Sequence, residues 1–254
     1  PLPAYHIQDY TTANLALTYS AYGKYVIESQ SNIKVFDIAP MGTDNTIYRP
    51  LDKAAVRTKY NLNTDIIIFG TVCRNQPRKR LAEYFDSIRH FIYKYGKDSD
   101  VVQKTYFLLH TSSPDVGISI PEHIQRNGIG KHLLFTYVCG GCNQLYVLPY
   151  QGDHGVPCNK CKTLSCRFPA TTKGVSSEVM AEIYNLCDYY LQPSCAGAQE
   201  TPISEAKCCA IPVLAPPVAA MAETVQSADD YLNYRGEEED FVHIVTSDYI
   251  KNYW

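Results

Sequence analysis

The sequence lacks the features that mark membrane-spanning and secreted proteins. Its 254 residues contain no run of about 20 apolar residues, the length a spanning helix needs, and no charged-then-apolar signal peptide opens the chain. Charge of one sign is also scarce, because the formal net charge is only -3, which gives no support for a general nucleic-acid binder. These absences favour a globular cytoplasmic protein that is long enough to bury a full core.

Cysteine, by contrast, is plentiful, and its spacing predicts a metal site. Four of the ten cysteines form two CxxC pairs, Cys139/Cys142 and Cys158/Cys161. Each pair can place two thiolates on one ion, so the two pairs together complete the tetrahedral set of a zinc ribbon. Disulfide pairing or a redox dithiol is the alternative, but the other cysteines sit singly in apolar surroundings, as in reduced intracellular proteins.

The zinc ribbon is expected to be structural, because a four-cysteine site leaves no open position for a substrate. The segment between the two pairs resembles a short hairpin that cannot bury a core without the metal, and His154 and Cys166 are spare ligands nearby. Docking of a partner or a nucleic acid is a second possible role, although Lys160, Lys162 and Arg167 form only a modest basic patch.

Away from the cysteines, apolar runs alternate between the period of strands and that of helices. Continuous apolar runs predict strands at 34–38, 66–72, 105–110, 132–138, 189–192 and 211–215. Spacings of three and four residues predict helices at 20–29, 52–60, 81–95, 121–127, 176–187 and 204–209. This alternation predicts an α/β fold with a doubly wound, Rossmann-like parallel sheet.

The loop after the 66–72 strand is a candidate anion site. It reads GTVCRNQPRK from Gly70 to Lys79, and Arg74, Arg78 and Arg80 lie in or beside it. The next helix begins directly afterwards, and its unpaired N–H groups also favour negative charge. A solvated basic loop is the plain alternative. Ligands of doubly wound sheets bind at the carboxyl ends of the strands. The loops expected to share one cleft are 40–44, 70–79, 110–117 and 193–205.

Several blocks, taken in order, resemble the donor-binding half of a retaining glycosyltransferase of the two-Rossmann-domain (GT-B) architecture, in the glycogen-synthase-like and sucrose-synthase-like family. APMGTDNTIYRP (39–50) resembles the family's strand and Gly-x-Asp turn. VSSEVMAEIYNLCDYYLQPS (175–194) and EAKCCAIPV (205–213) resemble the helix, strand and Glu-Ala motif that lead into and follow the catalytic loop. The likeness covers roughly residues 12–225, without the cysteine insertion. Within the family, the chain more specifically resembles phage- or virus-type members in which a cysteine ribbon is inserted.

The resemblance implies transfer of a sugar from a UDP- or GDP-sugar, with retention, to an unknown acceptor such as a glycan, protein, lipid or modified DNA base. Arg74 and Lys79 correspond to the family's Arg and Lys that grip the donor diphosphate, so no catalytic metal is expected. Glu205 corresponds to the Glu that holds the donor ribose. The other implied donor-binding residues are Gly42, Glu200, Thr201 and Pro202.

Two positions depart from the family's pattern. The family's first motif Glu, eight residues before Glu205, falls on Gly197, and Ala210 replaces the usual Gly. Glu200 supplies the missing carboxylate if the loop shifts by three residues. If it does not, the chain is a non-catalytic sugar-nucleotide or nucleic-acid binding module that uses the zinc ribbon. A different Rossmann-like enzyme, such as an epimerase, is disfavoured because no GxGxxG opens a strand-helix unit. His110, at a strand end near the cleft, is expected to be structural.

The resemblance also sets the expected domain organisation. Residues 1–30 are the linker or end of a preceding domain, and residues 31–138 and 167–232 form the donor domain. The zinc ribbon occupies 139–166, and 233–254 is an incomplete tail. Because the chain starts at Pro1 and the likeness begins just before the donor domain, we expect a fragment that is active only with an N-terminal acceptor domain.

Overall fold

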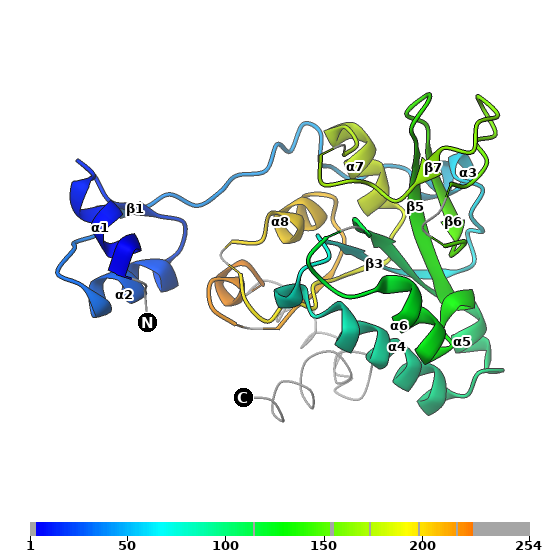
Figure 1. Cartoon of the computed structure of the whole chain (residues 1–254), viewed down its shortest axis with the longest axis horizontal. Helices are drawn as coiled ribbons and strands as arrows, with labels where there is room; N and C mark the ends of the chain where they lie inside the picture. The colour runs from blue at the N-terminus through cyan, green and yellow to red at the C-terminus, as the bar shows by residue number, and fades with distance from the viewer. Residues whose placement is uncertain are drawn as a thin grey trace.

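A seven-stranded mixed sheet forms the centre of the molecule, and helices pack on both of its faces (Figure 1). The computed structural model describes residues 4–113, 115–152, 155–172, 174–197, 199–216 and 218–225. Two features named above lie outside the described residues, the spare ligand His154 and the tail 233–254, as do residues 226–232 at the end of the expected donor domain.

All but two of the strands, those of the cysteine segment, lie where the sequence predicts a strand. The strands are β3 (Ile67–Val72), β4 (Thr105–His110), β5 (Leu133–Cys139), β6 (Leu145–Pro149), β7 (Cys166–Arg167), β8 (Tyr189–Leu191) and β9 (Val213–Leu214). Their order is β6-β5-β4-β3-β8-β9, with β7 also paired to β5. Strands β5, β4, β3, β8 and β9 run parallel to one another, whereas β6 and β7 run antiparallel to β5. The expected α/β fold with a mainly parallel sheet is therefore confirmed.

The helices of this domain are α3 (Lys53–Lys59), α4 (Leu81–Tyr95), α5 (Asp100–Lys104), α6 (Ile120–Asn127), α7 (Ser177–Asn185) and α8 (Thr201–Cys208). Ser176 caps α7 by accepting a hydrogen bond from the N–H of Val179, as its sequence predicts. Helix α8 begins three residues earlier than expected, because Pro202 is tolerated in a first turn. Among the helices that the structure describes, none combines the length and apolar character that crossing a membrane requires.

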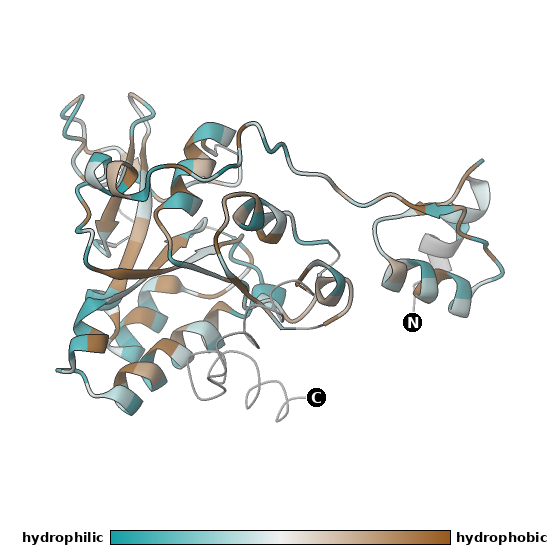
Figure 2. Cartoon of the chain, turned by 180° about the vertical axis from the view of Figure 1, so that it is seen from behind, coloured by the Kyte–Doolittle hydropathy of each residue, from teal (hydrophilic) through white to brown (hydrophobic). Residues whose placement is uncertain are grey.

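Both faces of the sheet are buried, and alternate residues of each strand serve one face. Ile68 and Leu108 pack with residues of α3, α7 and α8, whereas Phe69, Phe107 and Leu109 pack with residues of α4 and α6. This two-residue alternation is the pleat of a strand that is covered on both sides. Figure 2 shows the hydrophobic residues following the strands and the inner sides of these helices.

In the central strand β3, Gly70 stands where Cys187, just before β8, comes close to the backbone. Gly70 is paired with Tyr190 of β8, and a Cβ atom at Gly70 would lie 2.3 Å from the sulfur of Cys187. Any larger residue would force apart β3 and the turn between α7 and β8. The glycine that closes the apolar run is therefore a packing requirement of the sheet.

A small unit precedes the large domain (Figure 1). It contains α1 (Ala4–Thr12), β1 (Leu17–Thr18), α2 (Ala21–Gln30) and β2 (Asp37–Ile38). The strand expected at 34–38 is thus shorter than predicted, and it pairs in parallel with β1 rather than with the large sheet. It forms its own strand-helix-strand unit because residues 39–52 carry the chain away to α3. The Glu223 carboxylate links the two parts, since it accepts hydrogen bonds from the N–H groups of Ala21 and Tyr22.

A buried guanidinium ties α3 to the sheet. The side chain of Arg57 is 3% exposed, and its Nη2 lies 2.6 Å from Oδ2 of Asp188. Its remaining donors bind the carbonyl oxygens of Thr64, Ile66 and Leu186 at 2.9–3.1 Å. Burial raises the pKa of Asp188, but hydrogen bonds from Lys53, the Ile68 N–H and Arg57 outweigh burial and hold this pKa below its ordinary value. The network is fully satisfied and stabilises the start of β3 and β8.

We expect Arg57→Met to lower the free energy of unfolding by about 3 kcal/mol or more, because it leaves buried carbonyl groups and a carboxylate without partners. Lys53→Met is the matched control, since Lys53 pairs with the same carboxylate but is 40% exposed; its expected cost is below about 1 kcal/mol. Urea denaturation measures both values, and equal losses would contradict the role of Arg57. Because the Asp188 pKa is depressed, the difference from wild type should hold above about pH 4 and fade below it.

Candidate functional site

Two loops leave adjacent strands in opposite directions at the centre of the sheet. From β3 the chain runs to β4 and then β5, whereas after β7 it returns to β8 and β9 on the other side of β3. The loops at the carboxyl ends of β3 and β8 therefore diverge and open a crevice. In doubly wound sheets this switch in strand order is where ligands bind. The loops that flank it here are 73–80 and 192–200.

A lysine, an arginine and a glutamate meet across this crevice. Nζ of Lys79 lies 2.5 Å from Oε2 of Glu200, and Nη1 of Arg78 lies 3.0 Å from Oε1 of the same carboxylate. The side chains of Lys79 and Glu200 are 5% and 9% exposed, whereas Arg78 is half-exposed. The predicted residues Lys79 and Glu200 are therefore brought together, and Arg78 joins them although the family pattern assigns it no role.

Hydrogen bonds to the backbone join the two loops. The N–H of Cys195 donates to the carbonyl of Arg78 at 3.0 Å, and Nη1 of Arg78 reaches the carbonyl of Ala196 at 3.3 Å. The amide of fully buried Gln192 lies 3.4 Å from Oε2 of Glu200. The position of Glu200 is thus set by β8 and by the basic loop together.

Arg74 belongs to a different cluster. Its Nε and Nη2 donate to the two carboxylate oxygens of Asp115 at 2.9 and 3.1 Å, and its side chain is 57% exposed. The hydrogen bond from Arg74 is the main cause that holds the pKa of Asp115 below its ordinary value. Among the residues that the structure describes, Arg74 and Lys79 therefore pair with different carboxylates, and Lys79 is the more deeply buried of the two cations.

Asn75 braces the basic loop against the loop after β4. Its side-chain amide donates to the carbonyl of Ile118 at 2.8 Å and accepts from the Ile118 N–H at 3.1 Å. Asn75 is 1% exposed, and a Cβ atom at Gly117 would lie 2.1 Å from its Oδ1. Loops 70–79 and 110–117 are therefore in contact, as predicted.

The loop that carries Gly42 approaches the crevice from the side of the small unit. Gly42 is exposed and has no other side chain close to its Cα, but the N–H of neighbouring Met41 donates to Oε1 of Gln199. Gln199 directly precedes Glu200. All four loops that the sequence assigns to one cleft are thus linked by contacts.

Glu205 pairs with tyrosine hydroxyls rather than with a cation among the residues that the structure describes. Its Oε2 accepts a 2.6 Å hydrogen bond from the hydroxyl of Tyr184 in α7. Burial, followed by the charge of Glu205, raises the pKa of the neighbouring Tyr48 to about 12. Glu205 therefore lies on the side of α8 that faces α7, and its carboxylate interacts with the hydroxyls of Tyr184 and Tyr48.

An open pocket of about 270 Å³ lies beside Arg74, at the ends of β3 and β4. His110 lines it; Nδ1 of this ring is 2.9 Å from the Thr136 hydroxyl, and burial lowers the pKa of His110 to about 4. The ring is therefore neutral at physiological pH. Pro202 closes one side, and half-buried Thr201 stands next to it at the start of α8. The pocket is therefore lined by residues from three of the four predicted loops, 70–79, 110–117 and 193–205.

The opposite wall of this pocket comes from a segment that the sequence reasoning missed. Pro169, Ala170, Thr171 and Gly174 line it, in the stretch that returns from the cysteine pairs to α7. No local motif marks these residues. Their place follows only from β7, which pairs with β5 and directs the chain back to the crevice.

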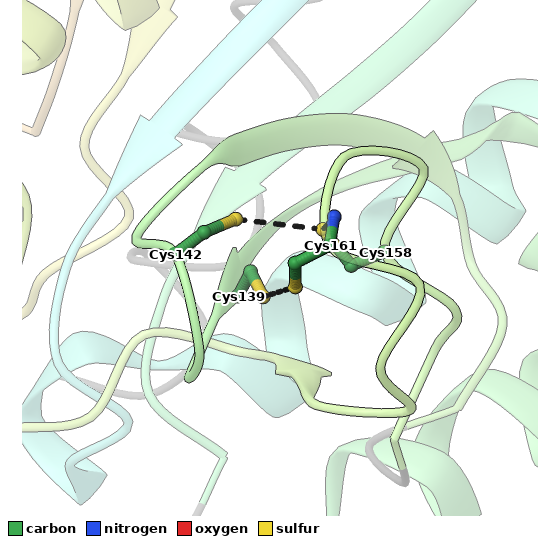
Figure 3. Close-up of side chains that lie close together, drawn as sticks. All are labelled: Cys139, Cys142, Cys158 and Cys161. Atoms are coloured by element: carbon green, nitrogen blue, oxygen red, sulfur yellow. Dashed lines mark hydrogen bonds between the residues drawn. The ribbon is translucent and has the colours of Figure 1, made fainter.

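The four cysteines converge on one point, as Figure 3 shows. The sulfur atoms of Cys139, Cys142, Cys158 and Cys161 all lie within 4.8 Å of one another, with Cys139–Cys161 at 3.5 Å and Cys142–Cys158 at 3.6 Å. Four sulfurs bound tetrahedrally at 2.3 Å would be about 3.8 Å apart, so the arrangement fits a zinc ion. A hydrogen bond from Ser165, aided by backbone N–H groups, lowers the pKa of Cys139 to about 5, which favours the thiolate.

The cysteine segment is less separate than the sequence suggests. Its hairpin is formed by β5 and β6 with the first cysteine pair in the turn, rather than within the stretch between the pairs. Leu145 and Val147 of β6 belong to the main hydrophobic core. The expected hairpin that cannot bury a core without the metal is therefore not found, because β6, from the segment between the pairs, extends the large sheet and packs into its core. Cys166, a spare ligand in the sequence, is buried in β7 opposite Cys139 and lies outside the four-sulfur group.

Comparison with solved structures identifies the fold. No family model and no curated protein matches the sequence. The structure is similar to sucrose-phosphate synthase from Thermosynechococcus elongatus, with a TM-score of 0.61, 17% identity, and coverage of 94% of this chain and 52% of that one. It is also similar to Anabaena HepE in complex with UDP, with a TM-score of 0.57 and 13% identity. That match covers 92% of this chain and 57% of HepE. A glycosyltransferase from Rickettsia africae has a TM-score of 0.55 and 12% identity, and the match covers 96% of this chain and 60% of that one.

These matches have low sequence identity and therefore show the fold alone. The chain spans between 52% and 60% of the length of the three structures. The first is a sucrose-phosphate synthase, the second is in complex with UDP, and the third is a glycosyltransferase. The mixed α/β domain described here thus has a fold found in GT-B glycosyltransferases.

Proposed function

We propose that the chain is the donor-binding part of a retaining glycosyltransferase and that it binds a nucleoside diphosphate sugar, either a UDP- or a GDP-sugar. The observation that carries the proposal is the meeting of Lys79, Arg78 and Glu200 at the switch in strand order. This is a pair of cations at the position where doubly wound sheets hold phosphates. Sucrose-phosphate synthase and the HepE complex with UDP, which share the fold, support the same substrate class.

The proposed reaction breaks the bond between the anomeric carbon and the diphosphate oxygen. The diphosphate leaves with the electron pair, while an acceptor oxygen forms the new glycosidic bond and releases its proton. Lys79 stabilises the negative charge of the leaving group, and Arg74 reaches it from the mouth of the crevice. Glu205 holds the donor ribose, and Gly42, Glu200, Thr201 and Pro202 line the donor. In this scheme the pocket of about 270 Å³ beside neutral His110 takes the base.

We propose that the acceptor, which is a glycan, protein, lipid or modified DNA base, is held by a second domain. The small unit supports this arrangement, because several of its large apolar side chains are exposed. Leu17, Tyr25 and Phe36 are 43%, 68% and 69% exposed. A two-stranded sheet cannot bury such residues by itself, and a clustered apolar surface marks an interface. The expected partner is an N-terminal acceptor domain that continues from β1 and β2.

Nucleotide titration tests the proposed donor site. Wild type is expected to bind UDP or GDP, and Lys79→Met and Arg74→Ala are each expected to weaken binding at least about tenfold, because each removes one charge-assisted contact. Isothermal titration calorimetry with UDP, GDP and ADP measures the affinities. Lys59→Met is the matched control, since Lys59 forms an exposed ion pair with Glu182 away from the crevice.

Failure of every nucleoside diphosphate to bind, or unchanged binding by both variants, would overturn the donor site. Salt-dependent binding of DNA or RNA in its place would favour the alternative function, a non-catalytic nucleic-acid binding module. In that case binding should be lost in Cys158→Ser, because the module would act through the cysteine group.

We further propose that Cys139, Cys142, Cys158 and Cys161 hold one structural zinc ion. The convergence of four sulfur atoms supports this, as does the absence of any other group of three metal-binding side chains in the described part of the chain. With all four ligand positions filled by thiolates, the ion would stabilise the turns after β5 and before β7 and take no part in sugar transfer.

Metal analysis tests the zinc site. The purified protein is expected to contain about one zinc per chain, and Cys158→Ser should lose it. Chelation should lower the midpoint of thermal unfolding, because zinc at a thousandfold excess over its dissociation constant stabilises a fold by about 4 kcal/mol. Cys208→Ser, in α8 and outside the group, is the control and should keep the metal. Metal-free wild type with unchanged stability would contradict the proposal.

A further inference from the structure

The two cations in the crevice are already neutralised by a carboxylate of the same chain. Glu200 contacts both Lys79 and Arg78, and the pair with Lys79 is almost fully shielded from solvent. A buried lysine without a partner carries a large desolvation cost, so some anion has to occupy this position. In the described structure that anion is Glu200.

The carboxylate occupies a place built for a phosphate group. Glu200 is the residue directly before α8, whose first turn has N–H groups that favour negative charge. Two cations lie on its other side, and the pocket beside Arg74 begins at Pro202, two residues further on. The two cations therefore converge on the Glu200 carboxylate directly before α8, although this carboxylate makes no capping hydrogen bond to the helix.

Gly197 leaves the space that Glu200 needs. A Cβ atom at Gly197 would lie 2.2 Å from Oε1 of Glu200 and 3.0 Å from its Cδ. The first distance is shorter than real contacts of a Cβ atom, so even alanine would force the carboxylate to shift from its position against the cations. The glycine and the position of Glu200 are linked by geometry, and a side chain at 197 excludes Glu200 from its present position.

We propose that the Glu200 carboxylate occupies the position of the donor diphosphate, and that the donor has to displace this carboxylate from Lys79 and Arg78. This rests on the proposed donor site. A ligand with a single negative charge gains little over the carboxylate that it replaces, whereas a diphosphate brings more charge to the same cations. Glu200 would thereby act as a specificity residue that selects nucleoside diphosphates over monophosphates by competition.

Competition predicts that removing the carboxylate tightens anion binding. Glu200→Gln is expected to bind inorganic pyrophosphate at least about tenfold more tightly than wild type, as coupling energies of close charge pairs imply. The preference for UDP over UMP should become smaller. Gly197→Ala should also tighten pyrophosphate binding while keeping the net charge. Glu83→Gln is the matched control, because Glu83 pairs with Arg80 nearby, and it should behave as wild type. Calorimetry measures all four proteins.

Thermal unfolding gives an independent measure. Without ligand, Glu200→Gln should unfold at a lower temperature than wild type, because Lys79 loses its buried partner, and saturating pyrophosphate should remove most of that difference. Weaker binding of pyrophosphate and UDP by Glu200→Gln and Gly197→Ala would overturn the inference while leaving the donor site in place. No binding by any of the proteins, wild type included, would overturn both.

Discussion

The structure depends on the burial of β3 between two parallel neighbours. Its residues pair with β4 on one side and β8 on the other, and both faces are covered by helices. Gly70 allows the close approach of Cys187 that this packing needs. Because the order of strands reverses at β3, the loops that leave β3 and β8 diverge at the same end of the sheet. Every residue proposed to bind donor phosphate reaches the crevice from these loops or from the loops that they touch.

The buried cations Arg57 and Lys79 differ in the number of partners that bind them. Arg57 has carbonyl groups for most of its donors besides the Asp188 carboxylate, so the network is complete and serves only to hold α3 on the sheet. Lys79 has one charged partner, Glu200, which stands on a loop beside an open pocket. A complete network has no place for a ligand, whereas a single pair can exchange its anion. Because of this difference in partners, the second cluster rather than the first is proposed as a binding site.

The cysteine segment is joined to the donor crevice by the sheet. Strand β6 extends the sheet from β5, and β7 pairs with the end of β5 next to Cys139. The chain leaves β7 through Phe168, which stacks on Phe135, and then forms the wall of the pocket beside Arg74. The segment therefore serves the site by shaping it, although its cysteine group lies outside the pocket.

The sequence by itself determined the order and type of the main elements, the cysteine group and the basic loop, because periodicity, caps and CxxC spacing are local signals. Only the tertiary structure decided which partners the charged residues take. Arg74 lies with Asp115, Lys79 with Glu200, and Glu205 with Tyr184, across separations of 41, 121 and 21 residues. It also placed β2 outside the large sheet and segment 169–174 in the pocket wall. Such contacts depend on which strands become neighbours, and no window along the chain contains that information.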